Sequence, residues 1–192
     1  MIYWFVIGLL KLFTRVIFRV KIEGYSGLPL RGPVVLAANH ISLWDPILVA
    51  AASRRPVHFM AKEELFRAPV LGKLLPHLKA FPVRRGENDR DAIRSALAVL
   101  SKGGVLGIFV EGTRNKGQEV MPLKRGAAML ASRGEATIIP VAIQRVKRRI
   151  TIKFGTPLTP QGPLVNRRTA YELVSRGLQE ALINMLEPVP QQ

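Results

Sequence analysis

The sequence predicts an α/β fold in which a mainly parallel or mixed central sheet is flanked by helices. Short apolar segments typical of buried strands alternate with segments of helical periodicity, and polar clusters follow several of the apolar segments. The chain has 192 residues, of which 48% are hydrophobic and 22% charged, which suits one globular domain with a substantial core. It contains no cysteine, so disulfides, thiolate nucleophiles and cysteine-ligated zinc are excluded.

The predicted elements follow one another in a regular order. After an apolar N-terminal helix, strands are expected at residues 20–23, 33–38, 57–61, 79–83, 105–110, 137–143 and 150–154. Helices are expected at 46–53, 62–75 (broken by Pro69 and Gly72), 89–102, 123–132 and 167–186. Asn88 is the expected N-cap of the helix at 89–102, and Gly134 ends the helix at 123–132.

The N-terminal segment has the character of a membrane-surface helix. Residues 2–10 are uncharged, and a helix of that length spans only about 14 Å, against a bilayer core of roughly 30 Å. Lys11, Arg15 and Arg19 then fall on one narrow polar stripe of an otherwise apolar helix, so we expect it to lie in the interface or to insert at a tilt. A helix packed on the core and a true membrane span are the alternatives. A secretory signal fits less well, because no positive charge precedes the apolar run.

The charge balance is strongly basic. The 29 Lys and Arg residues outnumber the 13 Asp and Glu residues and give a formal net charge of +16. Such a surface attracts nucleic acid, anionic lipid or phosphorylated small molecules. On charge alone, nucleic acid is the first candidate for the binding partner. The amphipathic N-terminal helix favours anionic lipid instead.

Polar clusters follow three of the predicted strands. They are Asn39-His40, Arg84-Arg85-Gly86 and Glu111-Gly112-Thr113-Arg114. In parallel sheets, sites form beyond the carboxyl ends of the strands. If these strands are parallel, all three clusters share one edge of the sheet.

His40 and Asp45 are the candidate catalytic pair. On a continuous helix the two side chains would diverge, but a turn from strand to helix can bring them together. Asp45 would then fix the tautomer of the imidazole, and the other ring nitrogen would take a proton from an alcohol that attacks an activated acyl group. Taken alone, His-x₄-Asp is more often incidental. Asp45 also suits the N-cap position before Pro46, and the two interpretations are compatible.

The cations at the strand ends suit a phosphate. Arg114 offers a bidentate fork, Gly112 lets the backbone approach a ligand, and Lys62 lies just beyond another strand. A polar turn with a surface ion pair is an equally good interpretation of residues 111–114 by themselves. Residues 124–126 (Lys-Arg-Gly) either join these cations or begin a helix.

Other chemistries find little support. The sequence has no G-x-S-x-G elbow, no Walker A motif and no Rossmann glycine pattern. His40, His58 and His77 lack metal-ligand spacing, so no metal site is expected, and His58 and His77 are expected to be structural.

Six ordered blocks resemble the glycerolipid acyltransferase family, the PlsC-like 1-acylglycerol-3-phosphate O-acyltransferases. Residues 39–45 resemble its NHxSxxD block (the HX4D motif), and 109–114 resemble FPEGTR. The other similar blocks lie at 61–65, 81–86, 139–142 and 154–158. Together they cover about residues 30 to 160. Two departures are Val110, where the family has a proline, and Arg84, where many members carry Asp.

The resemblance implies acyl transfer from acyl-CoA or acyl carrier protein to lysophosphatidate, with no other cofactor. It makes His40 the base and Asp45 its orienter. It also implies a glycerophosphate site formed by Arg85, Glu111, Gly112, Thr113 and Arg114, with Lys62. The expected domains are a membrane-associating helix at 1–20 and an acyltransferase domain at 21–192, on the cytoplasmic side of the cell membrane as a peripheral or monotopic protein.

The sequence therefore predicts a 1-acyl-sn-glycerol-3-phosphate acyltransferase at an anionic membrane surface. Another glycerolipid or lysolipid acceptor, such as glycerol-3-phosphate or an ornithine-lipid precursor, is the nearest alternative. A nonenzymatic basic nucleic-acid-binding protein is the rival from another class. Few aromatic residues and no basic helix suited to the major groove speak against specific nucleic-acid binding.

Overall fold

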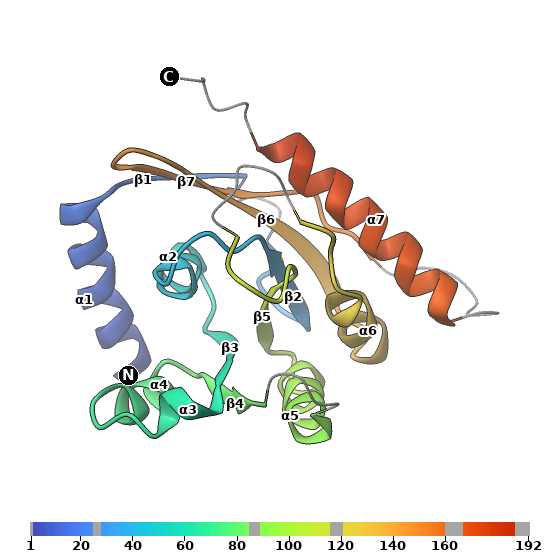
Figure 1. The fold of residues 1–192 in the computed structure, drawn as a ribbon, viewed down its shortest axis with the longest axis horizontal. Helices are drawn as coiled ribbons and strands as arrows, with labels where there is room; N and C mark the ends of the chain where they lie inside the picture. The colour runs from blue at the N-terminus through green and yellow to red at the C-terminus, as the bar shows by residue number, and fades with distance from the viewer. Residues whose placement is uncertain (1, 25–27, 85–88, 116–120, 160–166, 187–192) are drawn as a thin grey trace.

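The fold is known from a computed structural model that describes residues 2–24, 28–84, 89–115, 121–159 and 167–186. Within these residues, seven strands form one sheet in the order β1-β7-β6-β2-β5-β3-β4 (Figure 1). The strands are β1 (Arg19–Glu23), β2 (Val34–Ala38), β3 (Val57–Lys62), β4 (Phe81–Val83), β5 (Val105–Phe109), β6 (Thr137–Val146) and β7 (Arg149–Phe154). The helices are α1 (Ile2–Ile17), α2 (Asp45–Ala52), α3 (Glu63–Phe66), α4 (Leu71–His77), α5 (Arg90–Ser101), α6 (Gly126–Arg133) and α7 (Arg167–Met185).

The sheet is mixed, as predicted. β2 pairs in parallel with β5 and β6, and β3 pairs in parallel with β5 and β4. β6 and β7 form an antiparallel hairpin, and β1 runs parallel to β7. The carboxyl ends of β2, β5, β3 and β4 consequently lie at one edge of the sheet. The described residues of the three polar clusters, Asn39-His40, Arg84 and residues 111–114, follow β2, β4 and β5 at this edge.

Helices cover both faces of the sheet (Figure 1). Every residue of β2 is buried, and because strand side chains alternate, the strand serves two cores. Val34, Leu36 and Ala38 face the core that includes residues of α1 and α2. Val35 and Ala37 face the other core, to which α5, α6 and α7 contribute. An uninterrupted apolar strand of this kind requires cover on both faces.

Helix α1 is attached to the core along one face and presents another to solvent. Tyr3, Ile7 and Thr14 are buried, and the Tyr3 hydroxyl accepts a hydrogen bond of 3.1 Å from the backbone N–H of Val57. Large apolar side chains are exposed elsewhere on the same helix: Ile2, Trp4, Phe5, Leu9, Leu12, Phe13 and Val16. Among the described residues, no helix is both long and apolar enough to cross a membrane.

Some predicted boundaries were wrong. α1 ends at Ile17, not near residue 20, because Arg19 donates its N–H to the carbonyl of Arg148 and begins β1. Asp89, not Asn88, is the N-cap of α5, because its side chain accepts the N–H groups of residues 91 and 92. Asn88 itself lies outside the described residues. β6 continues to Val146 rather than ending at residue 143, since its pairing with β7 persists to that point.

The helix predicted at residues 62–75 is two helices, α3 and α4. A side chain at Gly72 would place its Cβ 2.1 Å from the carbonyl oxygen of Phe66. The glycine therefore permits the close backbone approach at which the chain turns between the two helices.

Candidate active site

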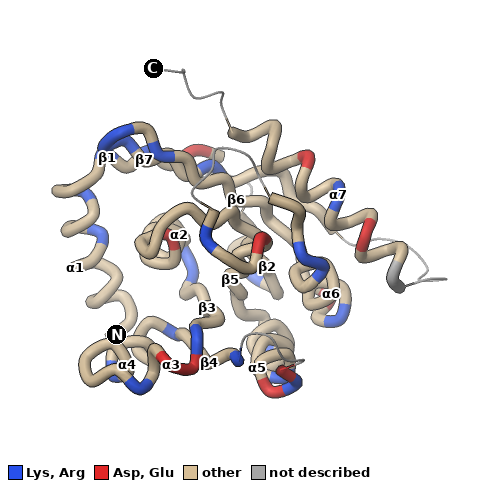
Figure 2. The backbone as a smooth tube through the Cα atoms, in the orientation of Figure 1, with Lys and Arg blue, Asp and Glu red and all other residues tan. Residues whose placement is uncertain are grey.

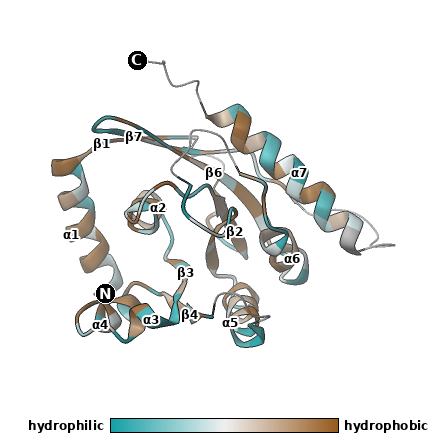
Figure 3. Ribbon diagram, in the orientation of Figure 1, coloured by the Kyte–Doolittle hydropathy of each residue, from teal (hydrophilic) through white to brown (hydrophobic). Residues whose placement is uncertain are grey.

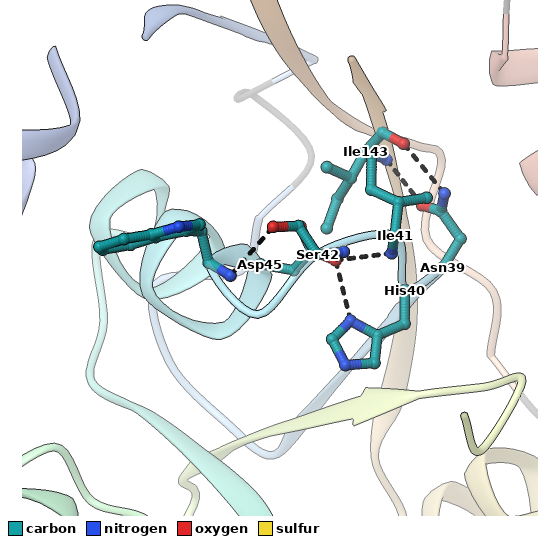
Figure 4. A network of polar contacts seen from close by, with 7 residues as sticks. Asn39, His40, Ile41, Ser42, Asp45 and Ile143 are labelled. Carbon is teal, nitrogen blue, oxygen red and sulfur yellow. Dashed lines mark hydrogen bonds and ion pairs between the residues drawn. The ribbon is translucent and has the colours of Figure 1, made fainter. Parts of the chain in front are cut away.

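The turn after β2 brings His40 and Asp45 together. The ring Nδ1 of His40 lies 2.8 Å from Oδ2 of Asp45, and both residues are buried, at 8% and 0% exposure. Oδ2 also accepts the backbone N–H groups of Ile41 and Ser42, each at 2.7 Å (Figure 4). Three N–H···O contacts on one oxygen are the pattern of a carboxylate acceptor, and the tautomer that fits it has its proton on Nδ1 and its lone pair on Nε2. The predicted contact between the two side chains is confirmed, and their catalytic roles stay predictions.

The capping role considered for Asp45 is wrong. Asp45 is the first residue of α2, and the cap position, Trp44, makes no side-chain capping bond. Pro46 follows immediately and supplies no N–H group. The carboxylate turns back onto the preceding loop, where the N–H groups of residues 41 and 42 are available, so its hydrogen bonds serve the loop and the imidazole.

Asn39 joins the same loop to β6. Its side-chain Nδ2 donates to the carbonyl of Ile143 at 2.9 Å, and its Oδ1 accepts the N–H of Ile143 at 2.7 Å (Figure 4). The side-chain amide thus makes the two hydrogen bonds that another β2 residue would make with β6 through its backbone. The sequence marks Asn39 only as a neighbour of His40, and its position directly after a buried strand is the one local sign of this role.

The imidazole of His40 lies on an aromatic platform. Its ring stacks on Phe109, the last residue of β5, with centroids 4.0 Å apart and planes inclined by 19°. Phe109 stacks in turn on Phe59 of β3, at 5.6 Å and 15°. Stacking limits rotation of the imidazole about its bond to Cβ, while Asp45 holds one nitrogen. Nothing in the sequence marks either phenylalanine as a support for His40, because both look like ordinary core residues in their strands.

The loop after β5 is attached to the loop after β2. Val110 donates to the carbonyl of Ala38 at 3.0 Å, and Asn115 donates its backbone N–H to the carbonyl of His40 at 2.7 Å. Residues 111–114 are thereby held beside the His40–Asp45 pair.

Glu111 is a buried member of this loop, with 4% of its surface exposed. Burial raises the pKa of Glu111 to about 7, an effect opposed by hydrogen bonds from the Met121 backbone and the Asn115 side chain and reinforced by the negative charge of Asp45. Within the described part of the chain, its Oε2 has no hydrogen-bond partner. Near neutral pH a substantial fraction of Glu111 is therefore protonated. Its predicted role in binding substrate stays a prediction.

Gly112 makes room for a lysine that the sequence left unassigned. Gly112 has a φ of +73°, and a Cβ there would lie 2.7 Å from Cε and 2.8 Å from Nζ of Lys124. The backbone of Lys124 is held by a hydrogen bond of 2.9 Å to the carbonyl of Val110. Lys124 therefore joins the cations of this loop. Arg125 instead pairs with Glu172 of α7 at 2.6 Å, and Gly126 begins α6.

The other predicted phosphate ligands lie at the same edge of the sheet. Thr113 and Arg114 are exposed beyond β5, and Lys62 is exposed at the end of the neighbouring strand β3. Arg84, after β4, is held by Glu63, with Nε 2.8 Å from Oε2. Its charge is thus largely compensated. Arg85, which the sequence analysis included in the site, lies outside the described residues.

Comparisons with known proteins identify the class to which this fold and site belong. The family model described as Acyltransferase matches residues 19–144. A 1-acyl-sn-glycerol-3-phosphate acyltransferase of Bacillus subtilis is 35% identical over 144 residues, which are 74% of this chain and 71% of that protein. Two other relatives of that name are longer, and the match spans 51% and 49% of their lengths. A lyso-ornithine lipid O-acyltransferase of Pseudomonas aeruginosa is 30% identical over 96% of this chain and 69% of its own length.

The fold agrees with these matches. The crystal structure of the 1-acyl-sn-glycerophosphate acyltransferase PlsC from Thermotoga maritima superposes with a TM-score of 0.66 and 26% identity, covering 91% of this chain and 79% of that one. The chain therefore belongs to the PlsC-like acyltransferase family and is an O-acyltransferase.

Proposed function

We propose that this protein transfers an acyl chain from acyl-CoA or acyl carrier protein to the sn-2 hydroxyl of lysophosphatidate and so forms phosphatidate. The observation that carries this proposal is the buried His40–Asp45 pair, which lies beside a loop bearing two cations, Arg114 and Lys124. The names of the Bacillus and Thermotoga relatives support the choice of acceptor.

In the proposed reaction His40 is a general base. Its Nε2 removes the proton of the acceptor hydroxyl as that oxygen attacks the thioester carbonyl. A C–O bond forms, the tetrahedral intermediate collapses, and the C–S bond breaks. The thiolate leaves with the proton that His40 carried. Asp45 stays ionised throughout and stabilises the transient imidazolium, which its 2.8 Å hydrogen bond also orients.

The cations of the β5 loop bind the phosphate of the acceptor in this proposal. Arg114 supplies a planar fork for two phosphate oxygens, and Lys124 supplies a second charge next to Gly112. Lys62 approaches from the end of β3, and Arg85 completes the set carried over from the family. A phosphate held here would present the acceptor hydroxyl to the base beside it.

The protein is proposed to work from a membrane surface, on the cytoplasmic side. The exposed apolar face of α1 supports this placement, together with Lys11 and Arg15 on an adjacent face of the same helix. Figure 3 shows the apolar character of α1 along its length. Such a placement keeps the acceptor within its lipid layer, because a long acyl chain need not leave the bilayer for its headgroup to reach the loop.

The mechanism is tested by His40→Ala in the purified full chain, assayed with lysophosphatidate and an acyl thioester. We expect turnover to fall by roughly 10²- to 10⁴-fold. His77→Ala is the matched control: His77 is exposed on α4 and bonds only the carbonyl of Lys73 among the described residues, so this variant should keep its activity. Turnover of His40→Ala close to that of the parent would overturn the role of His40.

A second acceptor is favoured by one observation. The Pseudomonas lyso-ornithine lipid acyltransferase matches 96% of this chain, including the N-terminal helix region that the family model leaves out. An ornithine headgroup carries no phosphate, so the two acceptors respond differently to Arg114→Gln. Lysophosphatidate should show a higher KM with this variant, and a lyso-ornithine lipid should not. A panel of both acceptors with the parent protein decides between them.

A further inference from the structure

A cluster of exposed cations lies at the far end of the β6–β7 hairpin, away from the residues assigned to catalysis. We call it the hairpin patch, and it consists of six exposed residues: Arg19, Lys21, Arg145, Lys147, Arg148 and Arg149. Figure 2 shows these blue segments gathered where β1 and β7 lie side by side, next to the carboxyl-terminal end of α1.

The strands place these cations close together. Arg19 and Arg149 are partners in the parallel pairing of β1 with β7, and Arg19 donates its N–H to the carbonyl of Arg148 at 2.8 Å. Arg19, Val20, Lys21 and Arg149 line a shallow concavity of about 410 Å³. The acidic residue described nearby is Glu23, which pairs with Lys21 at 2.7 Å and with Lys153 at 3.9 Å. Among the described residues, Glu23 is the one carboxylate paired with this patch, so several like charges are held together with little compensation, which is unfavourable unless an anion binds.

The hairpin patch extends from the same sheet edge as the active site. β2 ends at Ala38, opposite Val141, and β6 continues for five further residues to Val146, where its partner is the antiparallel strand β7. At about 3.3 Å per residue this extension reaches at most about 17 Å beyond the last β2–β6 pair. A planar surface touching the tip would thus lie on the side of the sheet from which the His40 loop also projects.

The hairpin patch is joined to the apolar helix α1. The guanidinium of Arg145 lies 5.1 Å from the centroid of the Phe18 ring, directly after the helix. Exposed Leu12, Phe13 and Val16 occupy the neighbouring turns. Charged and apolar surfaces therefore adjoin, as Figures 2 and 3 show for the same region.

We propose that the hairpin patch binds the phosphate headgroups of anionic phospholipids in the bilayer on which α1 rests. A nucleic acid would satisfy the charges but leave the adjoining apolar side chains of α1 in water. A bilayer satisfies both, because its headgroups carry the charge and its acyl region takes the apolar side chains. The inference rests on the proposed membrane association, and it does not depend on which acceptor the enzyme uses.

The test compares two charge-matched variants of the full chain. The first is Lys147→Asn, Arg148→Gln and Arg149→Gln combined; asparagine suits position 147, whose φ is +54°. Arg145 is kept because of its contact with Phe18. The control is Arg90→Gln, Lys102→Gln and Arg133→Gln combined, which removes three exposed cations from α5 and α6 and the turn after α5, on the other face of the sheet. Thermal unfolding verifies that both variants are folded.

Binding is measured with vesicles of phosphatidylcholine and phosphatidylglycerol in equal parts, and with pure phosphatidylcholine vesicles. The hairpin variant should bind the anionic vesicles on the order of 100-fold more weakly than the parent. Each cation near an anionic surface raises the binding constant by a factor of roughly five, and the variant lacks three of them. The control variant should stay within about threefold of the parent. With pure phosphatidylcholine, the parent and both variants should bind alike.

Two results would overturn the inference. One is equal loss of anionic-vesicle binding in both variants, which would mean that net charge alone acts. The other is unchanged vesicle binding in the hairpin variant with weaker binding to a short DNA duplex, which would assign the patch to nucleic acid. Activity on detergent-dispersed lysophosphatidate is measured in parallel. If the parent is inactive there while the vesicle results hold, the proposed acceptor fails and the hairpin patch does not.

Discussion

The backbone N–H of Asn115 donates to the carbonyl of His40 at 2.7 Å, which ties the loop after β5 to the loop after β2. One loop carries the proposed base and the other carries the proposed phosphate ligands. Because this bond is made by the backbone, it holds the two loops in a fixed relation without using any of the side chains that do the chemistry. The distance between the proposed base and the proposed phosphate ligands is therefore set by two adjacent parallel strands.

Asp45→Asn should lower turnover with lysophosphatidate by at least roughly 100-fold while the protein stays folded. An amide has no negative charge to stabilise the imidazolium. It can also present its NH₂ group instead of its oxygen to Nδ1 of His40, so it does not fix the tautomer. Steady-state kinetics, with circular dichroism to verify folding, measures the effect. Asp91→Asn, at an exposed position of α5, is the control and should behave as the parent. Full activity in Asp45→Asn would contradict the orienting role.

Glu111→Gln should change how stability depends on pH. The pKa of Glu111 is about 7 in the fold, against an ordinary value of 4.5. Its contribution to stability is fully present below pH 4.5 and is lost as pH rises through about 7, because the folded state must then bury the charge. The loss amounts to at most about 3 kcal/mol. The glutamine variant lacks this pH-dependent loss of stability, because glutamine does not ionise.

Urea denaturation at pH 5 and pH 8 measures this effect. The stability of Glu111→Gln relative to the parent should be higher at pH 8 than at pH 5. Glu180→Gln, at an exposed position of α7, should run parallel to the parent at both values. A constant difference between Glu111→Gln and the parent would show that Glu111 titrates normally.

Asn39→Ala should destabilise the fold by about 2–4 kcal/mol. It leaves both the N–H and the carbonyl of Ile143 without the side-chain partner that they have in this buried position. Chemical denaturation gives the change in the free energy of unfolding. Asn184→Ala removes an exposed amide from α7 and should change stability by less than about 0.5 kcal/mol. Equal stabilities of the two variants would show that the Asn39–Ile143 pair adds little.

Gly112→Ala should raise the KM for lysophosphatidate, while the protein stays folded with only a small loss of stability. The φ of +73° makes alanine strained by roughly 1–2 kcal/mol, and the new Cβ displaces the flexible end of Lys124 from its place beside the loop. Gly177→Ala on α7, where a Cβ meets nothing within 4 Å, is the matched control and should be neutral or slightly stabilising. An unchanged KM in Gly112→Ala would remove Lys124 from the proposed phosphate site.

The pattern of residues along the chain was enough to predict the sheet, each of the seven strands found in the described residues, and the edge to which the polar clusters lead. Alternating apolar strands and periodic helices indicate a parallel sheet, and in such a sheet the residues after each strand meet at one edge. His40, Asp45 and residues 111–114 were found in this way. The errors fell at ends of elements, such as the cap of α5, where Asn88 and Asp89 are locally equivalent candidates.

Other features depend on contacts between residues distant in sequence, which no local pattern contains. Phe109 reads as a core residue until the pairing of β2 with β5 places it under His40. The sequence leaves open whether Lys124 joins the cations of the site or begins a helix, and the structure packs its side chain over Gly112. Glu63 compensates Arg84 across 21 positions.

Helix α1 shows most clearly what the sequence determines and what the tertiary structure determines. The sequence by itself determined an apolar helix with a cationic stripe, because composition and period are local properties. Only the tertiary structure decided that Tyr3 and Ile7 belong to the core while Phe5 and Val16 face outward. Which residues are buried depends on which side of the helix meets β3 and α2, and the packing of the whole domain decides this. Because nearly all sides of this helix are apolar, burying one face leaves another apolar face exposed.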